Sequence, residues 1–569
     1  MHVHAPRADA SYVAIPPLAD ATAIAQRNRE CLAAARIDLQ GCDLSSIRAW
    51  ARREAIGAAR TYTAGLLAGE LPGRPADSKH AQGLSVPGDG GLSGGATTDA
   101  TEAALFVGGH QPTLFHPGVW VKNFVVGRLA HNERGIGLNL VVDTDTLSGT
   151  TVRVPTGRRS APGIAAILFD EPRPRQPWEE ARVVDRSLFT SFPDRVLAAL
   201  GESAAQPLVD EFWPAAVRRL AHSNSLAECL TAARSAWERG WGLANLELPV
   251  SRLCTLEPFL WFAAHLLAHL PRFHAVYNET LREYRQVNRV RSRTHPVPDL
   301  REQDGWLEAP FRVWRAGDEV RRPVFARQEG GELRLSDGAS VFATLPLTPG
   351  KDACCAVREL QLLAPRGIRF RTRALSTTLF ARLCFADLFV HGIGGAKYDQ
   401  MTDRIVARFF GLAAPEFLTL SATLRLVEEG LPVERTDELR LTRQLRELDY
   451  HPDRHVSAAT GPAVDSLIAE KRRLILEQHA ARGRVPPGAG APVPLGAGGY
   501  VRFRRFQEIN RLLADFTRDE RRRIEDELAR TRRQLAANAV LHDREYAFCL
   551  YPAEKLKRFM DHVCDATNA

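Results

Sequence analysis

A strand, a glycine turn, a helix and a second strand follow one another early in this chain, and they restrict its fold more than any other feature. The apolar run at residues 103–107 leads into two glycines, and a helix is expected from Val119 to Ala130. A second apolar run, Leu138 to Val142, follows a short turn. This order predicts a βαβ unit, in which parallel strands place a ligand crevice at their carboxyl ends. The sequence therefore predicts an α/β fold.

A strand, a turn and a helix recur in the same order later in the chain. The apolar run at 386–390 precedes the turn His391-Gly-Ile-Gly-Gly395, and a helix is expected from Lys397 to Phe410. Glycines let a backbone approach a ligand closely, although the spacing is not that of a Walker A loop. A tight turn without a ligand is the alternative. The candidate cofactor-binding residues here are Gly392, Gly394, Gly395, Lys397 and Arg373, and Arg382 is a second candidate anion clamp.

The length of 569 residues exceeds what one hydrophobic core usually organises, so several domains are expected. Short runs broken by Pro and Gly between His295 and Leu347 predict antiparallel strands inside an insertion. We expect a helical N-terminal segment at 1–70, a Gly/Ser/Pro-rich linker at 71–101, a core at 102–460 with helical and β insertions around 190–350, and a helical C-terminal hairpin at 461–569.

The expected hairpin consists of two charged segments with an apolar periodicity, Val464 to Ala481 and Phe503 to His542. One apolar stripe on an otherwise charged helix is typical of an antiparallel hairpin or a coiled coil. We favour a packed or dimerising element, and hence a homodimer, over a nucleic-acid-binding one.

Composition narrows the possible partners and compartment. The formal net charge of +8 suits an anionic partner, but an ordinary Arg-rich surface explains so small an excess. Nine scattered cysteines without a C-x-x-C pair indicate a reducing compartment, and Cys354 and Cys355 are expected to be buried. Neither a signal-peptide core nor a long apolar stretch is visible, so we expect a cytoplasmic protein that does not enter membranes.

The first glycine turn carries the strongest candidate site. The chain leaves the strand through Gly108 and Gly109, passes His110, Gln111 and His116, and enters the helix near a proline suited to the first helical position. Free N–H groups at a helix start favour a phosphate or carboxylate. We take the two histidines as candidate catalytic residues and the glycines and Gln111 as candidate cofactor-binding residues. Alternatively, the histidines only satisfy backbone groups of the loop.

Two acidic residues, Asp143 and Asp145, follow the second strand at the same edge of the sheet. We take both as candidate catalytic residues that bind a substrate amine, a ribose hydroxyl or a magnesium ion. Turn or cap residues are the equally weighted alternative. The absence of G-x-S-x-G and H-E-x-x-H argues against a serine hydrolase and a zincin, and we assign no metal site.

Three stretches resemble the cysteine-adding enzyme family of bacillithiol synthesis. Residues 109–118 are similar to its Gly-Gln-Gln-x-Gly-Leu-x-x-Gly-Pro turn, although His110 stands where the family usually has Gln and a His-Pro-Gly sequence replaces its Gly-Pro pair. Residues 141–145 resemble its strand with acidic residues at the end, and residues 389–395 resemble its Gly-rich segment. Leu420-Ser-Ala-Thr423 also agrees in position, so the resemblance covers patches from residue 103 to the end.

The resemblance implies a Rossmann-like core related to class I synthetases, connective insertions and a C-terminal coiled coil that mediates dimerisation. It also implies a reaction that joins the carboxyl group of cysteine to the amine of a glucosaminyl-malate acceptor. Our leading hypothesis is a ligase-like enzyme that forms a C–N bond, with ATP or another adenine nucleotide as a candidate cofactor. The alternative is a non-catalytic, dimeric nucleotide- or metabolite-binding protein with the same fold.

Overall fold

The computed structural model describes residues 3–68, 102–200, 206–292, 294–295, 297–456, 461–482 and 497–568. It divides into two compact units. Unit 1 comprises residues 1–156, 164–428 and 543–569, and unit 2 comprises residues 157–163 and 429–542. The predicted linker at 71–101 lies outside the described residues. Among the helices that are described, none combines the length and the apolar character needed to cross a bilayer.

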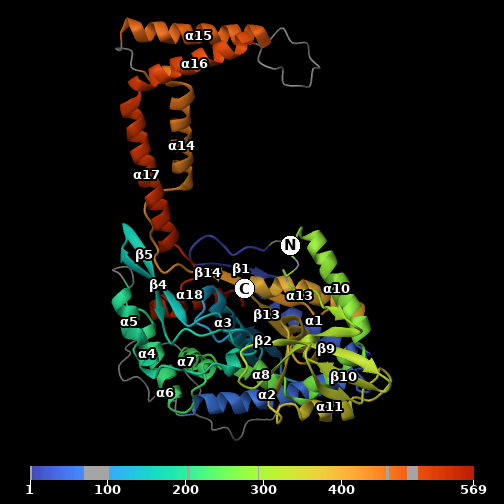
Figure 1. Cartoon of the computed structure of the whole chain (residues 1–569). Helices are drawn as coiled ribbons and strands as arrows, with labels where there is room; N and C mark the ends of the chain where they lie inside the picture. Colours follow the sequence, from blue (N-terminus) through green and yellow to red (C-terminus); the bar gives the residue numbers. More distant parts are fainter. Residues whose placement is uncertain are drawn as a thin grey trace. The chain divides into compact units, whose positions relative to one another are not determined.

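Unit 1 is built on a six-stranded sheet, and the predicted α/β fold is confirmed (Figure 1). Five neighbouring strands are parallel. The sixth strand, which the sequence did not reveal, lies at one edge and pairs antiparallel with the parallel strand next to it. In spatial order the strands are β1 (Ser11–Ile15), β14 (Phe417–Thr423), β13 (Leu388–His391), β2 (Leu105–His110), β3 (Ile136–Val141) and β6 (Leu246–Pro249).

The order of the strands reverses next to β2. From β2 the chain moves outward through β3 to β6, and it later returns to the other side of β2 to form β13 and then β14. Helix α3 (Pro117–Asn132) follows β2, and α13 (Ile393–Ile405) follows β13. Since the connections leaving two such strands diverge, a crevice opens beyond their carboxyl ends, where α/β proteins usually bind ligands.

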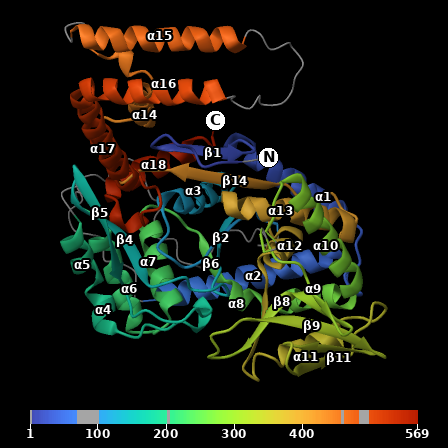
Figure 2. The same ribbon diagram turned by 45° about the horizontal axis from the view of Figure 1, so that its top comes forward.

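Alternate residues of each strand face two different hydrophobic cores. In β2, Val107 packs into the core that includes α2 (Leu44–Leu67), α9 (Glu257–Ala268) and α12 (Ala374–Cys384). Its neighbour Phe106 packs into the core of α3 and α18 (Ala553–Asp565) (Figure 2). Helices therefore cover both faces of the sheet, as parallel strands require.

The N-terminal helices belong to unit 1 and do not form a separate segment. Helix α1 (Ala21–Ala34) and α2 include most of the residues predicted to be helical. Buried Arg48 and Arg52 of α2 both pair with Asp387 at the start of β13, and Asp387 also accepts a 2.8 Å hydrogen bond from the Leu105 amide. Because these charges are paired inside the protein, α2 is fixed to the edge of β2 and β13.

A two-stranded sheet at residues 151–168, which the sequence did not reveal, begins the insertions between the parallel strands. After it the insertions are helical first and antiparallel later, as predicted. A five-stranded antiparallel sheet with the order β11-β10-β9-β8-β12 forms the inserted sheet, which continues past residue 350 because β12 joins it. In the helical part of the insertions, Trp213, Phe259 and Phe262 are fully buried and belong to the hydrophobic cores. The strands are β4 (Thr151–Arg158), β5 (Ala161–Leu168), β7 (Glu302–Gln303), β8 (Trp306–Arg315), β9 (Arg322–Glu329), β10 (Glu332–Ser336), β11 (Val341–Leu345) and β12 (Ile368–Thr372).

One expectation about the helices of these insertions is wrong. Cys354 and Cys355 were expected to be buried, but they are exposed at the start of α11, whose opposite face, with Val357 and Leu360, supplies the core contacts. The helices are α4 (Arg186–Thr190), α5 (Phe192–Ala199), α6 (Val209–Leu220), α7 (Leu226–Gly240), α8 (Val250–Leu253), α10 (Leu270–Val287) and α11 (Cys354–Gln361).

In its described residues, unit 2 contains four helices where the sequence predicted two. They are α14 (Arg435–Tyr450), α15 (Pro462–Arg482), α16 (Ala497–Phe516) and α17 (Arg518–Leu541). The single helix expected from Phe503 to His542 is interrupted at Thr517, whose hydroxyl donates to the Ala514 carbonyl. The helix changes partner there, because Ile509 and Leu513 pack against α15 whereas Ile524 and Leu528 pack against α14.

The expected boundary between the core and the C-terminal hairpin also differs from the observed division. Unit 2 begins before residue 460 because α14 packs along α17. The chain then returns to unit 1 at residue 543, where Tyr546, Phe548 and Tyr551 are fully buried beside α3 and α6. Residues 543–569 therefore complete the core of unit 1 and are not part of a hairpin.

Candidate functional site

A cavity of about 790 Å³ lies in unit 1 at the carboxyl ends of β2 and β13, which is the place that the strand order indicates. Ten of the thirteen candidate residues line it, and Gly108, Asp143 and Arg382 do not. The ten are Gly109, His110, Gln111, His116, Asp145, Arg373, Gly392, Gly394, Gly395 and Lys397. The two glycine turns, far apart in the sequence, thus contribute to one cavity.

His110 ends β2 and offers a hydrogen-bond acceptor to the cavity. Its Nδ1 lies 3.1 Å from the Gln111 carbonyl oxygen, so this nitrogen carries the proton and donates it. Burial, reinforced by the charge of Lys122, lowers the pKa of His110 to about 3, and the ring is therefore neutral near pH 7. Its Nε2 then keeps a lone pair for a donor such as an amine or a hydroxyl.

His116 acts as the cap of α3. Its Nδ1 accepts a 3.1 Å hydrogen bond from the Gly118 amide, which satisfies one of the free donors at the helix start. Burial, followed by the charge of Arg544, lowers the pKa of His116 to about 4. The proton of the neutral ring is therefore on Nε2, which lies 3.7 Å from Glu545 Oε2. His116 thus satisfies a backbone group of the loop, which was the alternative to a catalytic role.

Pro117 occupies the first position of α3, as predicted, and Gly118 lets the helix start lie against the sheet. A Cβ atom at Gly118 would come within 1.9 Å of the Ala422 carbonyl oxygen of β14. Any side chain at this position would push α3 away from the sheet. The position of the helix start, and of the residues that follow it, therefore depends on this glycine.

Lys122, in the second turn of α3, is the principal residue that the sequence did not single out. Only 4% of it is exposed, it lines the cavity, and its Nζ donates a 3.1 Å hydrogen bond to the Gly109 carbonyl. Among the described residues, no carboxylate pairs with it within 4.0 Å. Burial lowers the pKa of Lys122 to about 8. A buried ammonium without a counter-charge favours an anion in the cavity.

The second glycine turn places the start of α13 at the same cavity. Gly392 is the N-cap of α13, and the glycines after it line the cavity. The helix begins at Ile393, four residues earlier than predicted, so Lys397 lies within its second turn. A Cβ atom at Gly392 would be 3.9 Å from Lys122 Nζ. The ammonium group and the positive end of the α13 dipole therefore point to one region.

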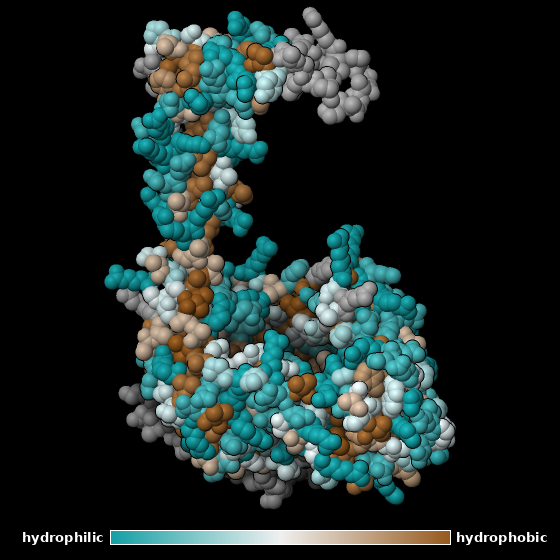
Figure 3. Space-filling view, in the orientation of Figure 1, coloured by the Kyte–Doolittle hydropathy of each residue, from teal (hydrophilic) through white to brown (hydrophobic). Residues whose placement is uncertain are grey.

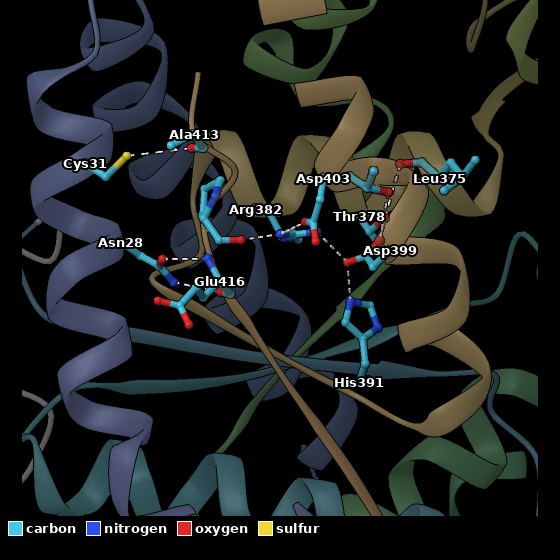
Figure 4. A network of polar contacts seen from close by, with 12 residues as sticks. Asn28, Cys31, Leu375, Thr378, Arg382, His391, Asp399, Asp403, Ala413 and Glu416 are labelled. Carbon is cyan, nitrogen blue, oxygen red and sulfur yellow. Dashed lines mark hydrogen bonds and ion pairs between the residues drawn. The ribbon is translucent and has the colours of Figure 1, made fainter. Parts of the chain in front are cut away.

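His391, the last residue of β13, is bound to a buried carboxylate (Figure 4). Its Nε2 lies 2.6 Å from Asp399 Oδ2, and the ring stacks on Phe389 with the ring centroids 4.3 Å apart. A Cβ atom at Gly395 would lie 2.6 Å from Nδ1 of His391, so a glycine is needed there. His391 and Asp399 thus hold the first turns of α13 against the end of β13.

Asp399 is also the partner of Arg382, which changes the expectation for this arginine. Arg382 Nη1 donates a 3.0 Å hydrogen bond to Asp399 Oδ2, and Nη2 bonds Asp403 and the Pro415 carbonyl. The predicted role of Arg382 as an anion clamp is therefore wrong, because its guanidinium is buried and already bound to two carboxylates. Burial favours protonation of Asp399, but the charges of His391 and Arg382 outweigh it and hold its pKa below the usual range.

The two candidate carboxylates after β3 lie in different surroundings. Asp143 is buried outside the cavity and accepts hydrogen bonds from the amide and the hydroxyl of Ser251, which attach β3 to α8. Burial, followed by the charge of Glu179, raises the pKa of Asp143 to about 7. Asp145 lines the cavity, where it pairs with Arg321 at 3.0 Å and accepts a 2.8 Å hydrogen bond from Gln111.

The charged groups of the lining favour an anionic ligand. Six cationic side chains line the cavity against three carboxylates, Asp145, Asp399 and Glu545. The cations are Lys122, Arg312, Arg321, Arg373, Lys397 and Arg544. Within the described part of the chain, no three His, Cys, Asp or Glu side chains converge as metal ligands. Phosphate and carboxylate groups are the natural ligands of such a lining.

No protein-family model and no curated protein matches this chain.

Several residues of the cavity were missed because their sequence context is ordinary. Lys122 stands in an apolar helix, where a lone lysine usually reaches the solvent. Asp399 lies eight residues after His391, and only the bend at the start of α13 brings them together. A histidine at the end of an apolar run, followed by glycines, was the one available signal.

Proposed function

We propose that unit 1 is a Rossmann-like, ligase-type enzyme that activates or binds a carboxyl group and joins it to the amine of a small acceptor. The observation that carries this proposal is the buried, uncompensated Lys122 beside the start of α13 in the cavity. Along the chain, the five parallel strands have the spatial order 3-2-1-4-5, which is the order of dinucleotide-binding folds and supports this class.

Each part of the cavity has a task in this proposal. Lys122 and the N–H groups of α13 hold the phosphate of a nucleotide such as ATP, or the carboxylate to be joined. His110 Nε2 accepts a hydrogen bond from the incoming amine and orients its lone pair. Asp145, held by Gln111 and Arg321, is a carboxylate of the same lining and is available to bind the amine. By resemblance, the substrates are cysteine and a glucosaminyl-malate acceptor.

The reaction can be tested directly with these substrates. The full chain is incubated with cysteine, the glucosaminyl-malate acceptor and ATP, and the amide product is measured by mass spectrometry. We expect the variant His110→Ala to form product at least about 100-fold more slowly, since an oriented polar contact to the nucleophile is lost. His110→Gln restores the residue of the similar family and should retain more activity. Equal rates in all three proteins, or no product in any, would contradict the proposal.

A second candidate is binding of a nucleotide or metabolite without chemistry. The structural tasks of His116 and Asp143 favour it, because two of the four predicted catalytic residues are engaged in holding α3 and α8. ATP binding by the wild-type chain without any product from cysteine and the acceptor would support this candidate over the ligase.

We further propose that unit 2 mediates a homodimer. Its helix α16 exposes Tyr500, Val501, Phe503 and Phe516, each more than half exposed. Hydrophobic residues also reach the surface on the face of unit 2 that Figure 3 shows. A single chain gains nothing from exposing such residues, whereas a second copy would bury them.

Replacing Phe503 and Phe516 together with glutamate is expected to convert the dimer into monomers. The change places like charges where apolar contacts between copies are proposed. Sedimentation equilibrium measures the mass, and Val287→Glu is the control, because Val287 is 70% exposed but belongs to unit 1. A wild-type chain that sediments as a monomer, or a double variant that stays dimeric, would refute this assignment.

A further inference from the structure

Arg312, on the inserted sheet, lines the same cavity as Lys122 but belongs to a different wall. The pairing of β8 with β9 shifts register between Ala309 and Arg312, and such a bulge re-aims the side chains beside it. The side chain of Arg312 is 25% exposed. Within the described residues it makes no hydrogen bond of its own, and its one ion-pair partner, Glu308, is 3.9 Å away.

Glu308 is already occupied by two other arginines. Its Oε1 accepts a 3.0 Å hydrogen bond from Arg373 Nη1, and its Oε2 accepts a 2.8 Å hydrogen bond from Arg301 Nε. One buried carboxylate therefore serves three guanidinium groups. Arg321, the next cation of this wall, is balanced by Asp145 at 3.0 Å. The three arginines thus carry more positive charge than Glu308 balances, and Arg312 is the most weakly paired of them.

This charge is costly in the unliganded protein. Burial, followed by repulsion from Arg373, lowers the pKa of Arg312 to about 10. Arginine rarely accepts such surroundings without a counter-charge, because its guanidinium keeps its proton under nearly all conditions. The planar group, with donors free, matches the two oxygens of a carboxylate or a phosphate.

We propose that Arg312, with Arg373 beside it, forms a second anion subsite that binds a carboxylate or phosphate group of the amine-bearing substrate. That this substrate is the occupant rests on the proposed function, whereas the subsite itself does not. Lys122 and α13 provide one cationic place at the end of the parallel sheet, and Arg312 provides another on the inserted sheet. The two substrates are then each held by an anionic group, with the reacting amine directed toward His110.

The test measures anion binding at Arg312 separately from anion binding at Lys122. Calorimetric titrations with succinate and with inorganic phosphate are made on the full-length Lys122→Met chain, in which the first place is removed. They are repeated on Lys122→Met/Arg312→Met and on Lys122→Met/Arg315→Met, since Arg315 is exposed on the same strand and does not line the cavity. We expect the Arg312 double variant to bind at least tenfold more weakly than the single variant and the Arg315 control to be unchanged. The tighter of the two anions identifies the group as carboxylate or phosphate.

The melting temperature distinguishes an anion subsite from a purely structural role of Arg312. If the role were structural, removing Arg312 would lower the melting temperature. Because Arg312 is repelled by Arg373 and its only ion pair among the described residues is a long one, Arg312→Met alone should melt no lower than the wild-type chain in the absence of ligand, although it loses the anion. A lower melting temperature in Arg312→Met, equal anion affinity in both double variants, or no anion binding by the Lys122→Met chain would overturn the proposal. None of these outcomes depends on whether ATP binds, so the proposed function can fail while this inference holds.

Discussion

Replacing Lys122 with methionine is expected to weaken ATP binding about 10- to 100-fold, which is the loss of a charge-assisted contact of roughly 1.5–3 kcal/mol. Methionine has a similar length and suits the apolar surroundings of α3, so the fold is expected to be retained or stabilised. Isothermal titration calorimetry at pH 7 measures the affinity. Lys351→Met is the matched control, because Lys351 is exposed and outside the cavity.

The same lysine should make anion binding depend on pH. Its pKa of about 8 in the free protein means that the ammonium form predominates below pH 8 and is lost above it. Affinity for sulfate, whose charge is constant in this range, should therefore be nearly full at pH 7, about halved at pH 8 and about tenfold lower by pH 9. The dependence should disappear in Lys122→Met. A wild-type affinity that is constant from pH 7 to pH 9 would contradict the role of this lysine.

Replacing Asp399 with alanine is expected to lower the free energy of unfolding by about 3–5 kcal/mol, because it leaves Arg382 without its buried partner. The substitution also removes the carboxylate that holds His391 at the end of β13. Urea unfolding measures the effect. Asp403→Ala is the control, since Asp403 binds the same arginine but is 40% exposed, and it should cost about 1 kcal/mol or less. Equal losses in the free energy of unfolding of the two variants would contradict a larger contribution from the buried ion pair.

Asp399 should also contribute to acid sensitivity. Its pKa is held below the usual range in the folded protein, so the unfolded chain takes up a proton at a higher pH than the folded one. The stabilisation from Asp399 is therefore complete above the ordinary pKa of about 4 and is lost as the pH falls below it. The decrease in stability below pH 4 should be smaller in Asp399→Asn than in the wild-type chain.

The parts of the fold that the sequence predicted depend on local patterns. Glycines after an apolar run, Pro117 at a helix start and a second apolar run were sufficient to predict β2, α3 and β3. The carboxyl ends of β2 and β13 meet because parallel strands share an edge, so the residues of both glycine turns line one cavity. These inferences required only periodicity and the geometry of a βαβ unit.

The missed residues depend on packing between distant segments. Lys122 lies beside Gly392, 270 positions later in the chain, where a Cβ atom would be 3.9 Å from its Nζ. Arg312 reaches the cavity through a register shift in the inserted sheet, which no sequence period indicates. The break at Thr517 arises because α16 and α17 have different partners, although their combined sequence fits one continuous helix. Each of these features is set by tertiary contacts and not by local preference.

A crystal structure of the full chain with bound ATP tests the central claim most directly. The account predicts a phosphate group of ATP in the cavity, with oxygens about 3 Å from Lys122 Nζ and from the first N–H groups of α13. A nucleotide bound elsewhere on the chain, with the Lys122 ammonium still bonded only to the Gly109 carbonyl, would contradict it.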